Sequence, residues 1–304
     1  MSGYCKLRST DRRLHFCLIL HPSIGCIRDD RTMKQTLRLA VNLIPSRARH
    51  WIKHLPLIAR LQRFVVNRVL SGEPFVHRIN AGPANGLQFE VTLPHDKQFW
   101  TGMFEAEFAK SLSERVRRDD VCYDVGGHRG YMAGVLGLAG ASRVIVFEPL
   151  PDNVVSLKRL IELNPQLPLQ IEQMAVGNSD GEARFKVMAD RSMGKLATST
   201  FQAGVDAMEE LTVPLRRLDS MVFDEGLAAP NLIKIDVEGA EFDVLCGSSR
   251  TLAKYRPRLF IEAHTSTLAD LCVRKLIDLG YEVRQLERGT MNPDQTRHLV
   301  GEPK

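Results

Sequence analysis

The stretch VCYDVGGHRGYMAGVLGLAGASRVIVFEP, residues 121–149, has the pattern of a strand, a glycine-rich turn, a helix and a second strand. The turn contains Gly126, Gly127 and Gly130, and the second strand ends at Glu148. In a parallel α/β unit, a nucleotide-like ligand lies at the carboxyl edge of the first strand, where glycines let the backbone approach it closely. The stretch therefore predicts an α/β unit that binds such a ligand.

The spacing of the turn indicates which ligand fits. Glu148 lies 22 residues after Gly126, as expected for a carboxylate that accepts hydrogen bonds from ribose hydroxyls. The dinucleotide pattern G-x-G-x-x-G is not matched, because Val125 stands two positions before Gly127. The pattern that begins at Asp124 suits a ligand without a pyrophosphate, such as S-adenosylmethionine. An ordinary glycine-rich turn followed by a surface glutamate is the alternative.

Composition is typical of a globular protein, with 44% hydrophobic and 25% charged residues in 304. No apolar run approaches the ~20 residues that cross a bilayer. The apolar run at 14–20 is short and lacks a small-residue cleavage site, so no signal peptide is predicted. Six scattered cysteines without C-x-x-C pairing indicate reduced thiols. We therefore expect a cytoplasmic protein.

Basic charge is concentrated near the amino terminus, where residues 1–80 contain 15 Lys and Arg but only 4 Asp and Glu. Residues 1–32 show no clear periodicity and are expected to form a poorly ordered tail. Residues 33–100 are expected to form a basic region of helices and short strands. Within it, residues 57–70 have the pattern of an amphipathic basic helix. We expect this helix to pack on the parent domain, with peripheral membrane contact as the alternative.

Residues 101–304 are expected to form the main domain, an α/β fold with a doubly wound, mostly parallel sheet. One helix is expected from Trp100 to about Arg117. Residues 184–187 resemble a further strand and 189–204 a loop, and this insertion is expected to overhang the carboxyl edge of the sheet. The predicted strands of the sheet are 121–125, 143–148, 169–173, 231–236, 258–263 and 281–286.

A second informative segment, residues 231–245, brings three carboxylates to a junction between a strand and a helix. Asp236 ends the strand, Glu238 lies in the turn, and Glu241 is at the helix start. Acidic residues near a helix start favour the positive end of its dipole, which accounts for Glu238 and Glu241. It accounts less well for Asp236, because a carboxylate at the end of a strand faces the crevice.

Six motifs occur in order along the chain: DVGGHRG (124–130), FEPLPDN (147–153), AVG (175–177), LRRLD (215–219), KIDVEGAE (234–241) and IEAH (261–264). Together they resemble the FkbM-type methyltransferase family, and the resemblance extends from about residue 101 to about 280. It implies a class I methyltransferase fold with a final antiparallel strand near 296–300. It also implies transfer of a methyl group from S-adenosylmethionine to a hydroxyl oxygen.

The resemblance also implies which residues bind the cofactor. Asp124, Gly126 and Gly130 would face its methionine portion, and Glu148 its ribose. Ala175 and Val176 would face the adenine. The remaining expected cofactor-binding residues are Gly127, Pro149 and Asp236.

The glycine turn departs from the family pattern, which usually reads Gly-Ala-Asn-x-Gly. Here His128 replaces the small amide residue, and Arg129 adds a positive charge that would lie beside the sulfonium of the cofactor. These changes are expected to weaken or retune cofactor binding. A catalytically silent homologue that binds cofactor is therefore an alternative.

Methyl transfer to an alcohol needs alignment of the reactants and partial removal of the hydroxyl proton. His264 is the preferred general base, because an imidazole titrates near neutrality, and a purely structural role is the alternative. Asp236 is the second candidate, as a base or as a group that orients the acceptor. Glu238 would orient a neighbour or cap the helix. No metal is predicted at Asp236 and Glu238, because no histidine lies beside them in the sequence.

Other functions are disfavoured by the motifs. An NAD(P)-dependent oxidoreductase conflicts with the glycine spacing and with the lack of a Tyr-x-x-x-Lys pair. Amine methyltransferases carry an Asn/Asp-Pro-Pro-aromatic segment where this chain has DVEG (236–239). Nucleic-acid binding is not predicted, because the basic excess lies in the tail. The expected acceptor is a small-molecule or glycan hydroxyl, on a carbohydrate or a secondary metabolite, and the sequence predicts no oligomeric state.

Overall fold

The computed structural model describes residues 72–188, 194–196, 209–287 and 296–304, all of which belong to one compact unit. The predicted tail and the predicted basic helix lie outside these residues. Among the described helices, none combines the length and the apolar character needed to cross a bilayer.

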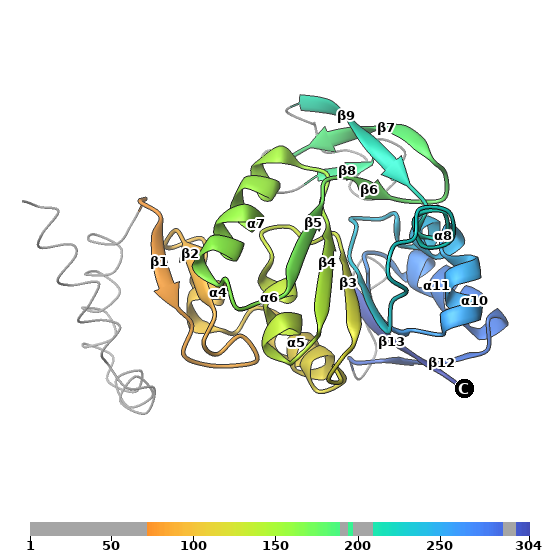
Figure 1. Ribbon diagram of the computed structural model, residues 1–304, viewed down its shortest axis with the longest axis horizontal. Coiled ribbons are helices and arrows are strands. Elements are labelled where there is room, and N and C mark those ends of the chain that lie inside the picture. Colours follow the sequence, from red (N-terminus) through yellow and green to blue (C-terminus); the bar gives the residue numbers. More distant parts are fainter. Residues whose placement is uncertain (1–71, 189–193, 197–208, 288–295) are drawn as a thin grey trace, which may run out of the picture. The chain divides into compact units, whose positions relative to one another are not determined.

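The centre of the fold is a seven-stranded sheet with the order β12-β13-β11-β10-β3-β4-β5 (Figure 1). All strands are parallel except β13, which lies antiparallel between β11 and β12. The predicted doubly wound sheet and its final antiparallel strand are thus confirmed. The strands are β3 (Val121–Val125), β4 (Arg143–Phe147), β5 (Leu169–Glu172), β10 (Leu232–Ile235), β11 (Arg258–Ala263), β12 (Tyr281–Gln285) and β13 (Arg297–Pro303).

Side chains alternate between the two faces of this sheet, because successive residues of a strand point to opposite sides. Cys122, Leu232 and Phe260 belong to one core, and Tyr123 and Ile233 to the other. Helices α4 (Lys97–Thr101), α5 (Ala106–Ser113), α6 (Tyr131–Leu138) and α7 (Pro151–Leu163) contribute to the first core. Helices α8 (Leu218–Phe223), α9 (Glu241–Cys246), α10 (Ser249–Tyr255) and α11 (Ser266–Asp278) contribute to the second.

A short hairpin of β1 (Phe75–Arg78) and β2 (Gln88–Val91) joins the first core through Leu87 and Phe89. The side chain of Asn164 holds it at the end of α7. Its Oδ1 accepts from the Gln88 N–H at 2.9 Å, and its Nδ2 donates to the Gln88 carbonyl at 2.8 Å. Residues on both sides of the predicted domain boundary at 100/101 therefore share one core.

The single helix expected from Trp100 to about Arg117 is wrong, because α4 and α5 are separate. Gly102 ends α4 with a φ of 71°. A Cβ on Gly102 would lie 2.2 Å from the carbonyl oxygen of Ala81, so the chain approaches the preceding loop too closely for another residue. The helical pattern did not reveal this tertiary contact.

A smaller, four-stranded sheet with the order β6-β9-β7-β8 lies over one end of the main sheet (Figure 1). It confirms the strand predicted at 184–187. The loop predicted at 189–204 is wrong in part, since residues 194–196 pair with β7; the remainder of that range lies outside the described residues. The strands are β6 (Ala175–Val176), β7 (Gly181–Val187), β8 (Gly194–Leu196) and β9 (Glu209–Arg216).

Candidate functional site

A cavity of about 330 Å³ opens at the carboxyl ends of β3, β4 and β10. Residues 126–128, 148–150 and 236–238, which follow those three strands, form its floor. Phe104, from the α4–α5 segment, and Phe185, from β7, line other parts of its wall. The insertion thus overhangs the carboxyl edge of the sheet, as expected from the sequence.

Gly126 is required by the close approach of two strand ends. Its φ is 79°, and a Cβ at this position would lie 1.7 Å from the carbonyl oxygen of Asp236. The N–H groups of Gly126 and Gly127 both donate to the carbonyl of Phe147, at 3.0 and 3.1 Å. The turn after β3 is therefore fixed against the ends of both neighbouring strands, which leaves bare backbone on the cavity wall.

Glu148 is almost fully buried and lines the cavity directly after β4. Its Oε2 accepts a hydrogen bond from the N–H of His128 at 2.7 Å, and its Oε1 accepts one from the N–H of Leu150 at 2.9 Å. Burial raises the pKa of Glu148 to about 7, although these N–H groups favour the charged form. The side chain of Asn153 also donates a hydrogen bond to this carboxylate. A carboxylate has about four lone-pair positions, so one more hydrogen bond, from a hydroxyl group, can still be accepted.

Lys234 connects the strand ends beneath the cavity. It faces Asp124 in the register of β10 and β3, and its Nζ lies 3.0 Å from Asp124 Oδ1 and 3.3 Å from Asp236 Oδ2. It also donates to the carbonyl of Gly126 at 2.8 Å. Although burial opposes it, the charge of Lys234 holds the pKa of Asp236 below its usual value. At the fully buried Asp124, burial prevails and raises the pKa.

His264 is buried among three carboxylates and does not line the cavity. Its Nδ1 lies 2.8 Å from Glu241 Oε1, and its Nε2 lies 3.3 Å from Glu238 Oε2 and 3.7 Å from Asp236 Oδ1. Burial alone would lower the pKa of His264, but the hydrogen bond with Glu241 and the nearby charges raise it to about 10. Burial and Asp236 raise the pKa of Glu238 to about 7, against the attraction of His264.

The two unusual residues of the glycine turn have different positions. His128 lines the cavity, whereas Arg129 points away from it. Arg129 Nη1 lies 2.8 Å from Asp96 Oδ1, and Nη2 donates to the carbonyl of Glu90 at 2.6 Å. The expectation that Arg129 places a charge beside the cofactor is therefore corrected, because its charge is paired with Asp96 and ties the turn to the amino-terminal segment.

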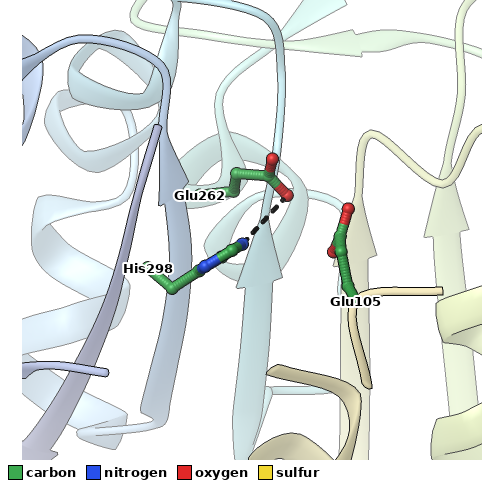
Figure 2. Close-up of side chains that lie close together, drawn as sticks. All are labelled: Glu105, Glu262 and His298. Carbon is green, nitrogen blue, oxygen red and sulfur yellow. Dashed lines mark ion pairs between the residues drawn. The ribbon is translucent and has the colours of Figure 1, made fainter. Parts of the chain in front are cut away.

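Glu105, Glu262 and His298 form a second group of ionisable side chains (Figure 2). Glu105 and Glu262 line the same cavity. Burial and the neighbouring Glu262 raise the pKa of Glu105 to about 8. One ligand atom from each of the three residues lies within 4.8 Å of the others, and the same holds for Asp236, Glu262 and His264. Both groups have donors that metal ions use in proteins.

Most of the residues predicted from the sequence meet at this cavity. Asp124, Gly130 and His264 do not line it: Asp124 is the partner of Lys234, and Gly130 packs on α7, where a Cβ would lie 2.6 Å from Leu157. The predicted residues that do line it are Gly126, Gly127, Glu148, Pro149, Ala175, Val176, Asp236 and Glu238.

Several residues at the cavity have no predicted role from sequence. Lys234 carries a usable signal, because a lysine in the apolar run Leu232–Ile235 needs a buried partner. Glu262 lies in the motif IEAH without an assigned role. The aromatic wall gives no such signal, since it comes from segments distant in sequence. The other cavity-lining residues without a role predicted from the sequence are Phe99, Phe104, Glu105, Tyr131 and Phe185.

Strained backbone is concentrated at the cavity. Among the described non-glycine residues, five have a positive φ, and three of these line the cavity: Glu105, His128 and Glu238. Such conformations cost free energy and persist where the surrounding structure imposes them, often at functional sites.

Comparison with known proteins agrees with the geometry. The family model "Methyltransferase FkbM domain" matches residues 124–286, just over half of the chain. The hexuronic acid methyltransferase AglP of Haloferax volcanii is 29% identical over 150 residues, which cover 49% of this chain and 58% of AglP. The 2-O-methyltransferase NoeI of Sinorhizobium fredii is 28% identical over 188 residues, which cover 56% of this chain and 76% of NoeI.

Among solved structures, a methyltransferase FkbM from Methylobacillus flagellatus is similar, with a TM-score of 0.43 and 21% sequence identity. The alignment covers 64% of this chain and 47% of that one. The chain thus spans only about half the length of that structure and 58% of AglP.

Proposed function

The chain belongs to the FkbM methyltransferase family, whose members use S-adenosylmethionine, and from this premise we propose that it methylates a hydroxyl oxygen of a carbohydrate. The observation that carries the proposal is the pair Asp236 and Glu238. These two carboxylates line the cavity next to the glycine turn, where an acceptor hydroxyl would meet the methyl group.

We assign the cofactor to the part of the cavity between the glycine turn and β6. Glu148 would accept hydrogen bonds from the ribose hydroxyls, as its position after β4 suggests. Ala175 and Val176 offer a buried apolar surface for the adenine. The bare backbone of Gly126 and Gly127 leaves room for the methionine portion.

Glu238 is our candidate for the general base. It faces the cavity, and its turn holds it at a φ of 53°. Asp236 would orient the acceptor, because it is anchored by Lys234 at 3.3 Å. We assign His264 a positioning role: it lies behind both carboxylates, and an imidazolium enclosed by carboxylates cannot accept a further proton. The role of general base predicted for His264 stays untested.

The carbohydrate acceptor is supported by two features. Glu105, Asp236, Glu238 and Glu262 bring several hydrogen-bond acceptors to the cavity, and sugar hydroxyls are donors for such groups. AglP and NoeI, by their names, methylate a hexuronic acid and a 2-hydroxyl position. A sugar ring with adjacent hydroxyls is thus the first acceptor to test.

The test uses S-adenosylmethionine with an isotope-labelled methyl group and a panel of hexuronic acid and neutral hexose glycosides. Product is detected by mass spectrometry, and the carbon shift of the new methyl group in NMR identifies an O-methyl. Glu238→Gln is expected to lower kcat by about 10²–10⁴-fold, the usual contribution of a general base. Its affinity for S-adenosylhomocysteine should stay unchanged.

The control is Asp243→Asn, a carboxylate close in sequence that does not line the cavity, and it should retain activity. Transfer to nitrogen or carbon would contradict the proposal, as would full activity of Glu238→Gln. Cofactor binding without transfer to any acceptor would favour the catalytically silent homologue. Binding of NADH in place of S-adenosylhomocysteine would contradict the cofactor assignment.

A further inference from the structure

Glu262 and His298 face each other across two antiparallel strands. They are direct partners in the register of β11 and β13, on the same face of the sheet as Phe260 and Val300. Glu262 Oε2 and His298 Nε2 are 3.6 Å apart, too far for a good hydrogen bond. Both atoms are buried, and neither makes a hydrogen bond to another described residue. Two good ligand atoms therefore face each other as a long ion pair (Figure 2). The charges of Glu262 and Glu287 raise the pKa of His298 to about 9 although burial opposes this, so a bound ion would take the place of a proton on the ring.

Glu105 approaches this pair from the start of α5 (Figure 2). It occupies the N-cap position, yet its side chain does not cap the helix. Its φ of 41° is uncommon for a residue other than glycine. The carboxylate is instead within 4.8 Å of the Glu262 and His298 ligand atoms. The strained turn thus brings a third ligand, a carboxylate oxygen, to the pair rather than stabilising the helix.

The imidazole of His298 is already oriented as a metal ligand would be. Its Nδ1 contacts Glu287 Oε1, and the backbone N–H of His298 donates to both oxygens of Glu287. The ring also packs against Phe108, with centroids 4.5 Å apart. A histidine that ligates a metal usually donates its other ring nitrogen to a carboxylate or a carbonyl, which fixes the ring and the tautomer. Glu287 supplies this contact and leaves Nε2 facing Glu262.

We propose that Glu105, Glu262 and His298 bind a divalent first-row transition metal ion at the wall of the cavity. Ligand atoms about 2.1 Å from one ion lie roughly 3.0–3.5 Å apart, so small side-chain movements would close the site. Two carboxylates and one imidazole suit Mn²⁺ or Zn²⁺ better than Ca²⁺, which prefers oxygen ligands alone. The ion would also offset the negative charge of Asp236 nearby, which acts on Glu105 together with Glu262.

The sequence-based argument against a metal depended on the absence of a nearby histidine. That absence holds for the sequence alone, because the fold brings His264 and His298 to this region from distant segments. We place the ion at Glu105, Glu262 and His298 rather than at Asp236, Glu262 and His264, because the Nδ1 and Nε2 atoms of His264 already face three carboxylates.

Glu105 and Glu262 line the cavity, so the open coordination positions of the ion would face an acceptor. A metal ion lowers the pKa of a hydroxyl that it binds. The site would therefore assist deprotonation of the acceptor, and this step alone depends on the proposed function.

The first measurement is a calorimetric titration of the chelator-treated full chain with MnCl₂ and, separately, ZnCl₂, without cofactor. One equivalent of at least one ion should bind. Glu105→Gln removes a ligand and should weaken binding at least about tenfold, and Glu287→Gln should weaken it about 10–100-fold by loosening His298. The matched control is Glu107→Gln, an exposed carboxylate on the same helix, which should bind as the wild type does.

Failure of the folded wild-type chain to bind either ion would overturn the proposal. Equal affinity in Glu105→Gln and the wild type would also overturn it. If circular dichroism shows that Glu105→Gln does not fold, the metal affinity of Glu287→Gln is compared with that of the wild type instead. Metal binding without methyl transfer would support the metal site and contradict the proposed function. Methyl transfer at equal rates with chelator and with metal would show that the bound ion takes no part in catalysis.

Discussion

At the scale of single residues, Glu148 links protonation to cofactor binding. Its carboxyl group is buried, and this burial raises its pKa to about 7 although the charge of Lys234 acts in the opposite direction. Ribose hydroxyls donate hydrogen bonds most strongly to the ionised form. Cofactor binding should therefore require loss of this proton at a pH where an ordinary glutamate is already ionised.

We predict that the affinity for S-adenosylhomocysteine rises up to about tenfold per pH unit below pH 7 and levels off above it. Calorimetry between about pH 5.5 and 8.5 measures this profile. Glu148→Gln should bind weakly with a flat profile across the same range. A flat profile in the wild type would show that Glu148 is ionised before the cofactor binds.

The same pKa makes a prediction for the ligand-free protein. Because the folded pKa of Glu148 lies above the unfolded value, its contribution to stability is fully present below about pH 4.5 and is lost as the pH rises through about 7. The melting temperature of Glu148→Gln should therefore fall less than that of the wild type between about pH 5 and 7.5. Scanning calorimetry of both proteins in the same buffers tests this difference.

At the scale of helices and strands, the sequence predicted the elements more accurately than the contacts between them. The apolar runs around Asp124 and Asp236 indicate strands by their short length and apolar character, and the glycines indicate the turn after the first. The separation of α4 from α5 depends on Gly102 meeting a loop some 20 residues earlier, which no local pattern contains. Likewise, Glu262 and His298 become neighbours only through the register of β11 and β13.

The adjacent strands β3 and β10 are joined by a buried ion pair that the sequence pattern did not identify. Lys234 and Asp124 are both almost inaccessible, and Nζ lies 3.0 Å from Oδ1. Removing one partner of a buried pair leaves an uncompensated charge, which costs about 3–5 kcal/mol. Lys234 also holds the carbonyl of Gly126, so the turn depends on the same contact.

We predict that Lys234→Met lowers the free energy of unfolding by about 3–5 kcal/mol. The double variant Lys234→Met/Asp124→Asn should recover part of this loss, because it neutralises one of the two carboxylates that face Lys234. Lys158→Met, at an exposed site on α7, is the control and should change stability by less than about 0.5 kcal/mol. Urea titration measures all three; a double variant less stable than Lys234→Met would contradict the pairing argument.

At the scale of the whole molecule, the cavity is where three parts of the chain meet. The ends of the main strands form its floor, Phe104 of the α4–α5 segment lines one side, and Phe185 of the smaller sheet lines another. The sequence predicted the floor, since its residues lie in the motifs. It did not predict the walls, because aromatic residues in unrelated segments acquire a common surface only after folding.

This arrangement leads to a prediction about how binding changes the whole protein. S-adenosylhomocysteine at about 100 times its Kd should stabilise the fold by about 2.7 kcal/mol, whereas NADH should have no effect. Because the ligand would contact all three parts, amide hydrogen exchange should slow in β6–β9 and in the α4–α5 segment as well as at the glycine turn. Phe185→Ala should reduce the protection in the smaller sheet and preserve it at the turn. Protection confined to residues 124–130 in the wild type would mean that the smaller sheet and the α4–α5 segment do not contact the cofactor. These two parts would then contact only the acceptor.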